Sequence, residues 1–385
     1  MMPANPAPHA PKAKPATFEK KLTDIWYEGA NAGWLTGPLA LLSLIYRGLR
    51  WATQQHSKAL ASRKPTQPPV LVVGNLIAGG AGKTPVVLAV CETLKAQGLK
   101  VGIVSRGYGK QSSTVVVLSP GLSGASQAPT LDAKQIGDEP AWLLEQTQCP
   151  IAVGAQRKQA YLALIDRHPD LDLVVSDDGL QHHKLERTLE WVVFDDRLVG
   201  NRKMIPAGPL REPLTRLHTV DAILASNVSA EVLSAALGKE RSEELRAELS
   251  AHIHEIKVVP HQFRHMQTGR ILSISEAQTI WATKDVCAFA GLGNPNKFFK
   301  ALKKINIPVG KSIGLPDHFD YPAEFCESLP HEILLTTGKD AVKLPLQESR
   351  LWVVDVKVTL PPALIHQLEN AIGRSFGSRI GLPNL

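Results

Sequence analysis

The sequence has none of the features of a secreted, disulfide-stabilised protein. Its 385 residues include only four cysteines, which lie at least 39 positions apart and lack the paired spacing of a zinc site. Acidic residues stand within the first 28 positions, where a secretory signal would need an apolar core. We therefore expect the protein to lie in a reducing, cytoplasm-facing compartment.

Long apolar runs are also scarce. Residues 29–46 carry no charge, but Gly33, Gly37 and Pro38 interrupt them, so a continuous spanning helix of about 20 residues is not expected. Residues 17–64 instead predict a helical hairpin that lies in or dips into an anionic leaflet, with tryptophans around its apolar part. The alternative is an N-terminal helix packed on the next domain. The Pro- and Ala-rich residues 1–16 are expected to form a disordered tail.

The positive charge of the chain is concentrated near its start. The formal net charge is +7, and residues 1–64 hold nine Lys and Arg against three acids. The remaining residues hold 34 basic and 33 acidic side chains, which is close to neutral. This distribution favours contact with an anionic membrane surface, and no nucleic-acid partner is expected.

A nucleotide phosphate site is predicted between residues 70 and 96. The β-branched run at 70–73 indicates a buried parallel strand, and it is followed by a glycine-rich loop, a Lys-Thr pair and a helical stretch. Backbone amides of such a loop close around a polyphosphate, the lysine reaches the outer phosphates and the threonine hydroxyl can bind Mg²⁺. Ile77 stands where the first glycine of the usual motif is expected. The predicted ATP-binding residues are Gly79, Gly80, Ala81, Gly82, Lys83 and Thr84.

A second strand, expected over residues 171–175, ends in acidic residues. Asp177 and Asp178 follow it, as metal-organising acids do in phosphate-loop enzymes, and with Thr84 they form the predicted Mg²⁺ site. The alternative is an Asp-Asp-Gly turn that merely closes the strand.

The alternation of short apolar runs with helical stretches predicts an α/β fold of the phosphate-loop type, with a mainly parallel sheet. Ligands of such sheets bind at the carboxyl ends of the strands, where several polar loops would gather. Asp138 and Glu139 open a helix in one of these loops, and they could equally be favourable acids in its first turn.

These motifs together resemble the tetraacyldisaccharide 4′-kinase family over roughly residues 17–380. The resemblance rests on a Gly-Asn-Leu-x2-Gly-Gly-x-Gly-Lys-Thr-Pro loop (74–85) and on the following segments, in this order: Ser-Arg-Gly-Tyr (105–108), Gly-Asp-Glu-Pro (137–140), Asp-Asp-Gly-Leu-Gln-His (177–182), Pro-Ala-Gly-Pro-Leu-Arg-Glu (206–212), Phe-Ala-Gly-Leu-Gly-Asn-Pro (289–295), Pro-Asp-His-Phe (316–319) and Thr-Gly-Lys-Asp-Ala-Val-Lys (337–343).

The resemblance implies an ATP-dependent kinase of lipid A synthesis on the cytoplasmic face of the bacterial inner membrane. Its lipid substrate would be a tetraacyl disaccharide 1-phosphate, phosphorylated on the 4′-hydroxyl. It also implies that Asp138 accepts the hydroxyl proton and that His318 works beside it, with Lys83 as the third catalytic residue. Without the resemblance, His318 would be an ordinary loop histidine.

The remaining predicted site residues are candidate contacts to the sugar, its phosphate or the nucleotide. They are Arg106, Glu139, Arg157, Gln181, Arg211 and Glu212. For Arg106, Arg157 and Gln181 the alternative is an ordinary solvated or structural role.

The expected organisation has five parts: a tail (1–16), a membrane-associated helical segment (17–64), a phosphate-loop core domain (65–251), a connecting ribbon (252–282) and a smaller α/β domain (283–385). The alternative function is a membrane-associated phosphate-loop ATPase or GTPase that acts as a conformational switch. The late Thr337-Gly338-Lys339-Asp340 segment departs from the base-reading motif of GTP-binding proteins, which favours ATP.

Overall fold

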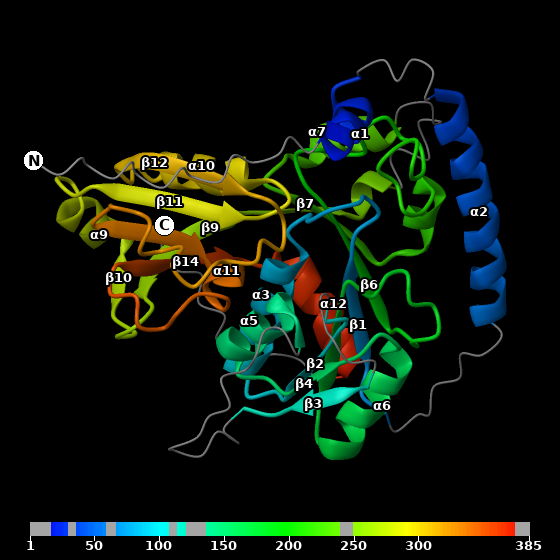
Figure 1. The fold of residues 1–385 in the computed structure, drawn as a ribbon. Coiled ribbons are helices and arrows are strands. Elements are labelled where there is room, and N and C mark those ends of the chain that lie inside the picture. Colours follow the sequence, from blue (N-terminus) through cyan, green and yellow to red (C-terminus); the bar gives the residue numbers. More distant parts are fainter. Residues whose placement is uncertain are drawn as a thin grey trace, which may run out of the picture.

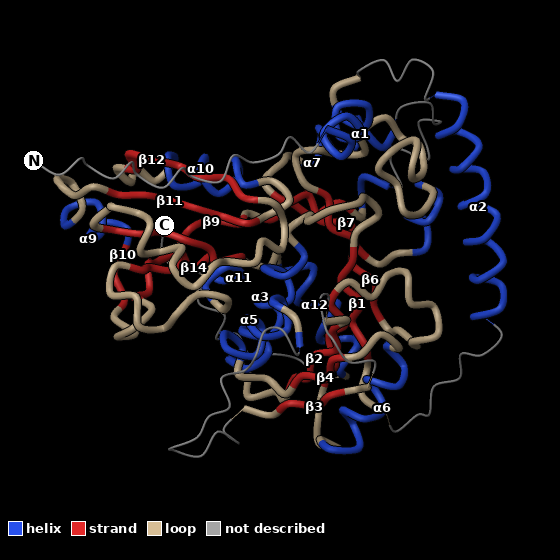
Figure 2. Tube along the Cα trace, viewed as in Figure 1, coloured by secondary structure: helices blue, strands red, loops and turns tan. Residues whose placement is uncertain are grey.

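A computed structural model describes residues 17–29, 36–58, 67–107, 114–120, 136–238 and 249–373. The predicted tail lies outside these residues, as do the turn of the predicted N-terminal hairpin at 30–35 and Trp34 within it. The chain forms two sheets that lie side by side, with helices on their faces (Figures 1 and 2).

The larger sheet has eight strands in the order β3-β4-β2-β5-β1-β6-β7-β8, and all neighbouring pairs are parallel except β3 with β4. Its central strands are wholly buried and mainly apolar, as is typical of strands covered on both faces. The expected mainly parallel α/β fold is thus confirmed. The strands are β1 (Val70–Gly74), β2 (Val101–Ser105), β3 (Val116–Leu118), β4 (Ile151–Val153), β5 (Leu173–Asp177), β6 (Leu189–Phe194), β7 (Ala222–Ser226) and β8 (Ile253–Ile256).

Helices cover both faces of this sheet. On one face α3 (Lys83–Ala96), α5 (Asp138–Thr147) and α12 (Pro362–Ile372) share a buried apolar cluster with alternate strand residues. On the other face α6 (Arg157–Arg167) and α7 (Ala230–Gly238) share a second cluster. The side chains of β1 alternate between the two clusters: Leu71 and Val73 belong to the first, and Val72 belongs to the second.

The smaller sheet has six strands in the order β10-β9-β14-β13-β11-β12. Strand β9 is antiparallel to both of its neighbours, β10 and β14, and the other neighbouring pairs are parallel. Its strands are β9 (Val258–His265), β10 (Ile271–Ser273), β11 (Val286–Gly291), β12 (Val309–Leu315), β13 (Ile333–Thr337) and β14 (Leu351–Val358). Its helices are α9 (Ile274–Ile280), α10 (Pro295–Lys304) and α11 (Gly338–Ala341).

The chain crosses between the sheets twice. Only Lys257 separates β8, at the edge of the larger sheet, from β9 of the smaller one, and the Asn227 side chain bonds both the N–H (2.9 Å) and the C=O (3.1 Å) of Val258 at this crossing. After β14 the chain returns, and α12 packs on the larger sheet with Gln367 accepting from the Trp191 indole at 2.8 Å. Residues 253–256, which form β8, are therefore part of the larger sheet, and residues 362–372, which form α12, pack on it. The predicted boundaries placed the first range in the connecting ribbon and the second in the smaller domain.

Two N-terminal helices, α1 (Thr17–Tyr27) and α2 (Thr36–Lys58), lie against the loops that follow β6, and α2 lies on the side away from the smaller sheet (Figure 1). The Trp26 indole donates to the carbonyl of Pro206 at 2.9 Å, so this tryptophan of the predicted helical hairpin contacts the protein. Among the described residues, no helix has both the length and the apolar character needed to cross a bilayer.

Candidate active site

The predicted phosphate loop joins β1 to α3. Gly79 (φ +89°) and Gly82 (φ +80°) adopt left-handed backbone conformations that favour glycine. Lys83 begins α3, whose free N–H groups and helix dipole attract anions. Ile77, the departure from the usual motif, is fully buried and pairs with Leu210 of the segment 203–212, so this neighbouring segment braces the loop.

Asn75 organises the loop, and the sequence analysis gave it no role. Its side-chain amide donates to the carbonyls of Ile77 (2.7 Å) and Gly79 (3.0 Å), while its Oδ1 accepts from Lys83 Nζ at 3.2 Å. One fully buried side chain thus fixes both the course of the loop and the position of its lysine. The Gly-Asn pair that ends β1 was the only signal for it in the sequence.

The two acids after β5 differ in their environments. Asp178 pairs with Lys83 (3.4 Å) and Arg211 (3.2 Å); burial raises its pKa, but these two cations outweigh burial and hold the pKa at about 2. For Asp177, burial together with the negative charge of Glu139 raises the pKa to about 7. Its buried Oδ1 has no hydrogen-bond partner among the described residues. The sequence could not separate the two aspartates, whereas their partners do.

Asp138, from the side of the larger sheet, contacts His318, from the side of the smaller sheet. Asp138 is the first residue of α5, and His318 lies in the loop after β12, 180 positions later. His318 Nδ1 lies 3.2 Å from Asp138 Oδ2, and Lys343 Nζ lies 3.4 Å from the same oxygen. Burial raises the pKa of Asp138, but the hydrogen bond from His318 and the charge of Lys343 outweigh it, so the pKa falls below its ordinary value. Asp138 is therefore an ionised, oriented carboxylate at neutral pH.

A second ion pair closes the same edge of the site. Lys339 Nζ lies 3.3 Å from Glu139 Oε1 and 3.1 Å from Asp317 Oδ1. Burial lowers the pKa of Lys339, but these two carboxylates raise it by more. Residues of the smaller sheet thus hold both acids at the start of α5.

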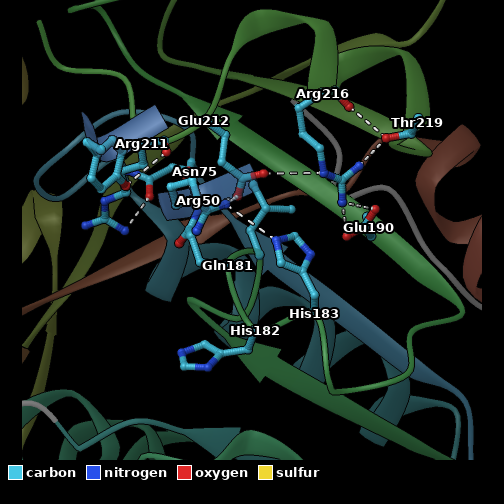
Figure 3. Close-up of polar contacts among 12 residues, drawn as sticks. Arg50, Asn75, Gln181, His182, His183, Glu190, Arg211, Glu212, Arg216 and Thr219 are labelled. Carbon is cyan, nitrogen blue, oxygen red and sulfur yellow. Dashed lines mark hydrogen bonds and ion pairs between the residues drawn. The ribbon is translucent and has the colours of Figure 1, made fainter. Parts of the chain in front are cut away.

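The predicted residues Gln181, Arg211 and Glu212 lie together behind the phosphate loop (Figure 3). Arg211 reaches Asp178 and Asn75, whereas Glu212 is 1% exposed and pairs with Arg50 of α2 at 3.1 Å. Gln181 Nε2 donates to Glu212 Oε1 (3.0 Å) and to the carbonyl of Asn75 (3.3 Å). The placement of Glu212 favours a structural role over the predicted substrate contact.

The other two predicted arginines, Arg157 and Arg106, differ in their exposure. Arg157 is 2% exposed and donates to the carbonyls of Gly154 (2.9 Å) and Asp177 (3.1 Å); burial lowers its pKa to about 10. This placement favours a brace between two loops over the predicted substrate contact. Arg106, which follows β2, is exposed.

A further cluster of charged residues contacts the phosphate loop, and none of its members was among the predicted site residues. Arg197 donates to the carbonyl of Gly80 at 2.5 Å and is held by Asp195 at 2.9 Å. Lys297, from α10 of the smaller sheet, lies 2.6 Å from both Asp195 and Asp196. Asp195 is therefore shared between the phosphate loop and the second part of the molecule.

A parallel sheet, a glycine-rich loop leading into a helix, a loop lysine and an acidic strand beside it define a phosphate-loop nucleotide-binding enzyme. An ionised carboxylate, Asp138, which His318 orients, lies at the start of α5.

Comparison with known proteins narrows this class. The family model described as tetraacyldisaccharide-1-P 4′-kinase matches residues 33–373. A tetraacyldisaccharide 4′-kinase of Bordetella petrii is 37% identical over 345 residues, which cover 88% of this chain and 92% of that protein. Another, of Herminiimonas arsenicoxydans, is 33% identical over 92% of this chain and 95% of its own length. The crystal structure of LpxK from Aquifex aeolicus in complex with ATP aligns with a TM-score of 0.65 and 26% identity, over 88% of this chain and 99% of that one. The chain belongs to the tetraacyldisaccharide 4′-kinase family, as its motifs indicated.

Proposed function

We propose that this chain transfers the γ-phosphoryl group of ATP to the 4′-hydroxyl of a tetraacyl disaccharide 1-phosphate, in lipid A biosynthesis. Family membership supports the reaction, and the solved ATP complex of a relative supports the nucleotide. The observation that carries the assignment to residues is the contact of Asp138 with His318 beside the phosphate loop.

The catalytic task follows from the chemistry of phosphoryl transfer. The transition state is loose, so the protein must position the groups and neutralise charge on the phosphoryl oxygens. Lys83 and the start of α3 supply positive charge to the phosphates. The hydroxyl oxygen bonds to the γ-phosphorus as the bond to ADP breaks, and the hydroxyl proton passes to the Asp138 carboxylate. His318 holds that carboxylate in one orientation.

The donor set fits Mg²⁺. The described residues contain no group of three His, Cys, Asp or Glu side chains that could hold a metal alone, but Mg²⁺ bound to substrate phosphates needs only one or two carboxylates. The unpartnered buried oxygen of Asp177 and the Thr84 hydroxyl would hold it, whereas Asp178 is already paired with Lys83 and Arg211. The ion would neutralise charge on the phosphate oxygens.

We further propose that α2 contacts the anionic cytoplasmic leaflet of the inner membrane. One face of α2, with Leu39 and Ser43, packs on the protein, and Ser43 bonds the carbonyl of Met204 at 2.7 Å. The opposite face exposes Leu41 (61%), Leu44 (64%), Ile45 and Leu49 (65%). An apolar stripe of this kind on a helix flanked by basic residues suits the plane of a membrane interface.

Incubation with γ-labelled ATP, Mg²⁺ and the tetraacyl disaccharide 1-phosphate tests the reaction. We expect the label in a lipid that carries two phosphates. Label that appears only as free phosphate would favour the switch ATPase instead.

A further inference from the structure

The segment 203–212 lies between α2 and the phosphate loop and contacts both. On one side Arg211 N donates to the carbonyl of Leu76 (2.6 Å), and Ala78 N donates to that of Pro209 (2.8 Å). On the other side the Tyr46 hydroxyl of α2 donates to the carbonyl of Arg211 at 3.1 Å. A displacement of α2 therefore acts on a segment that is hydrogen-bonded directly to the loop.

A series of polar contacts runs through the same layer from Arg50 of α2 to Asn75 (Figure 3), and the Asn75 side chain contacts Lys83. Arg50 of α2 pairs with Glu212 at 3.1 Å, and Glu212 accepts from Gln181 at 3.0 Å. Gln181 also donates to the main-chain carbonyl of Asn75 at 3.3 Å. The Asn75 side chain then holds Lys83 and two carbonyls of the loop.

Glu212 makes this series of contacts sensitive to the position of Arg50. The carboxylate is 1% exposed, and its other cation, Arg216, lies farther away at 3.6 Å. A buried carboxylate that loses a close cation is destabilised and must find other donors. Gln181 and the loops around it would then rearrange, and Gln181 is the residue that bonds Asn75.

The two faces of α2 have different tasks in this arrangement. Leu39, Ser43, Tyr46 and Arg50 recur at helical spacing on the inner face, where the polar members contact the segment 203–212 or Glu212. The outer face exposes the apolar stripe. The helix is thus a single body with an outward surface and an inward connection to the nucleotide site.

We propose that Arg50 is a positioning residue that couples contact of α2 with a lipid surface to the conformation of the phosphate loop, so that lipid contact tightens ATP binding. This rests on the proposed contact of α2 with the leaflet. Coupling between two binding sites is reciprocal, so ATP tightens membrane binding by the same factor.

The test measures the Kd of a non-hydrolysable ATP analogue with Mg²⁺, with and without vesicles of phosphatidylethanolamine and phosphatidylglycerol that lack the lipid substrate. For the unmodified chain we expect vesicles to lower this Kd about fivefold. Arg50→Gln removes the decrease, and Arg50→Lys, which keeps the charge near Glu212, restores part of it. The matched control is Arg47→Gln, which removes an equal charge from an exposed position of the same helix and keeps the full decrease.

Gln181→Leu interrupts the series of contacts from Arg50 to Asn75 at a different point, and we expect it to remove the decrease as well. Loss of the decrease in both variants would argue against a folding defect that is specific to Arg50→Gln. The same Kd with and without vesicles in the unmodified chain, while flotation shows it bound to them, would overturn the coupling and leave the proposed membrane contact intact. An equal decrease in Arg50→Gln and Arg47→Gln would overturn the role of Arg50. Absence of vesicle binding would contradict both the membrane contact and the coupling, while phosphorylation of the lipid in detergent would still support the kinase.

Discussion

Asp138 and His318 come within 3.2 Å of each other although one begins a helix on the larger sheet and the other lies in a loop of the smaller sheet. The contact between Asp138 and His318 therefore forms only when both parts of the molecule are in place. Lys343 and Lys339, both from the smaller sheet's side, reinforce the same contact through Asp138 and Glu139.

Replacement of the acceptor should remove turnover and spare nucleotide binding. We expect Asp138→Asn to lower kcat by about 100-fold or more, because a general base contributes at least that factor. The Kd of ATP should change little, since the hydrogen bond and the ion pair of Asp138 join it to His318 and Lys343 of the smaller sheet's side. Asp320→Asn, at an exposed position near His318, is the control and should keep its kcat. A kcat near that of the unmodified chain in Asp138→Asn would contradict the assignment.

The pH profile should report the contact with His318. Burial alone raises the pKa of Asp138, and His318 and Lys343 bring it below its ordinary value. His318→Ala removes one of these causes, so the pKa rises and the acid limb of the kcat/KM profile moves to higher pH. The position of that limb is the measurement, and an unchanged limb would exclude His318 as the partner.

The same pKa shift predicts how stability depends on pH. A carboxyl whose pKa is lowered on folding stabilises the protein above its unfolded pKa, and this contribution disappears as the pH falls through the folded value. The melting temperature of Asp138→Asn should therefore lie below that of the unmodified chain at pH 7, and the difference should shrink below about pH 4. A difference that grew on acidification would contradict the assigned direction.

The outer face of α2 predicts membrane affinity. Burial of a leucine contributes about 1.5–3 kcal/mol, so Leu41→Gln, Leu44→Gln and Leu49→Gln should each weaken binding to anionic vesicles by about tenfold or more. Leu162→Gln is the control, because Leu162 is similarly exposed (43%) but lies on α6. Flotation with vesicles measures the effect. Equal binding of the α2 variants and the control would exclude α2 as the contact.

The shared aspartate predicts a role for the smaller sheet in ATP binding. Lys297→Met removes the ion pairs to Asp195 and Asp196, and partly exposed pairs of this kind contribute about 1 kcal/mol. We expect the KM for ATP to rise about fivefold. Lys303→Met, at an exposed position of the same helix, should leave it unchanged. Equal KM values for the two variants would show that the contact does not assist nucleotide binding.

The sequence predicted the parts of the site that are local along the chain. The strand, glycine loop and helix around Lys83, and the acids after β5, could be predicted because each is encoded in one continuous stretch of the sequence. The roles of Asp138 and His318 came from resemblance, since no local pattern joins residues 180 positions apart. The pairing of Glu212 with Arg50 was missed because a helix with an apolar face gives no indication of which polar side chain it turns inward.

The fold shows the same division between local and distant features. The central strands were predictable because continuous apolar runs are typical of buried parallel strands. The return of α12 to the larger sheet was not predictable, because an apolar helix face does not by itself specify which sheet it covers, and contacts such as that of Trp191 with Gln367 join residues far apart in the sequence.

The central claim is transfer of phosphate to one particular hydroxyl of the lipid. Its most direct measurement is ³¹P and ¹H NMR of the lipid recovered after incubation with ATP and Mg²⁺. The account predicts a new phosphomonoester resonance that couples to the proton at carbon 4′, beside the original resonance at carbon 1. It also predicts that Asp138→Asn yields none of it under the same conditions. Recovery of the lipid unchanged while ATP is hydrolysed, or a phosphate at any other hydroxyl, would contradict the account.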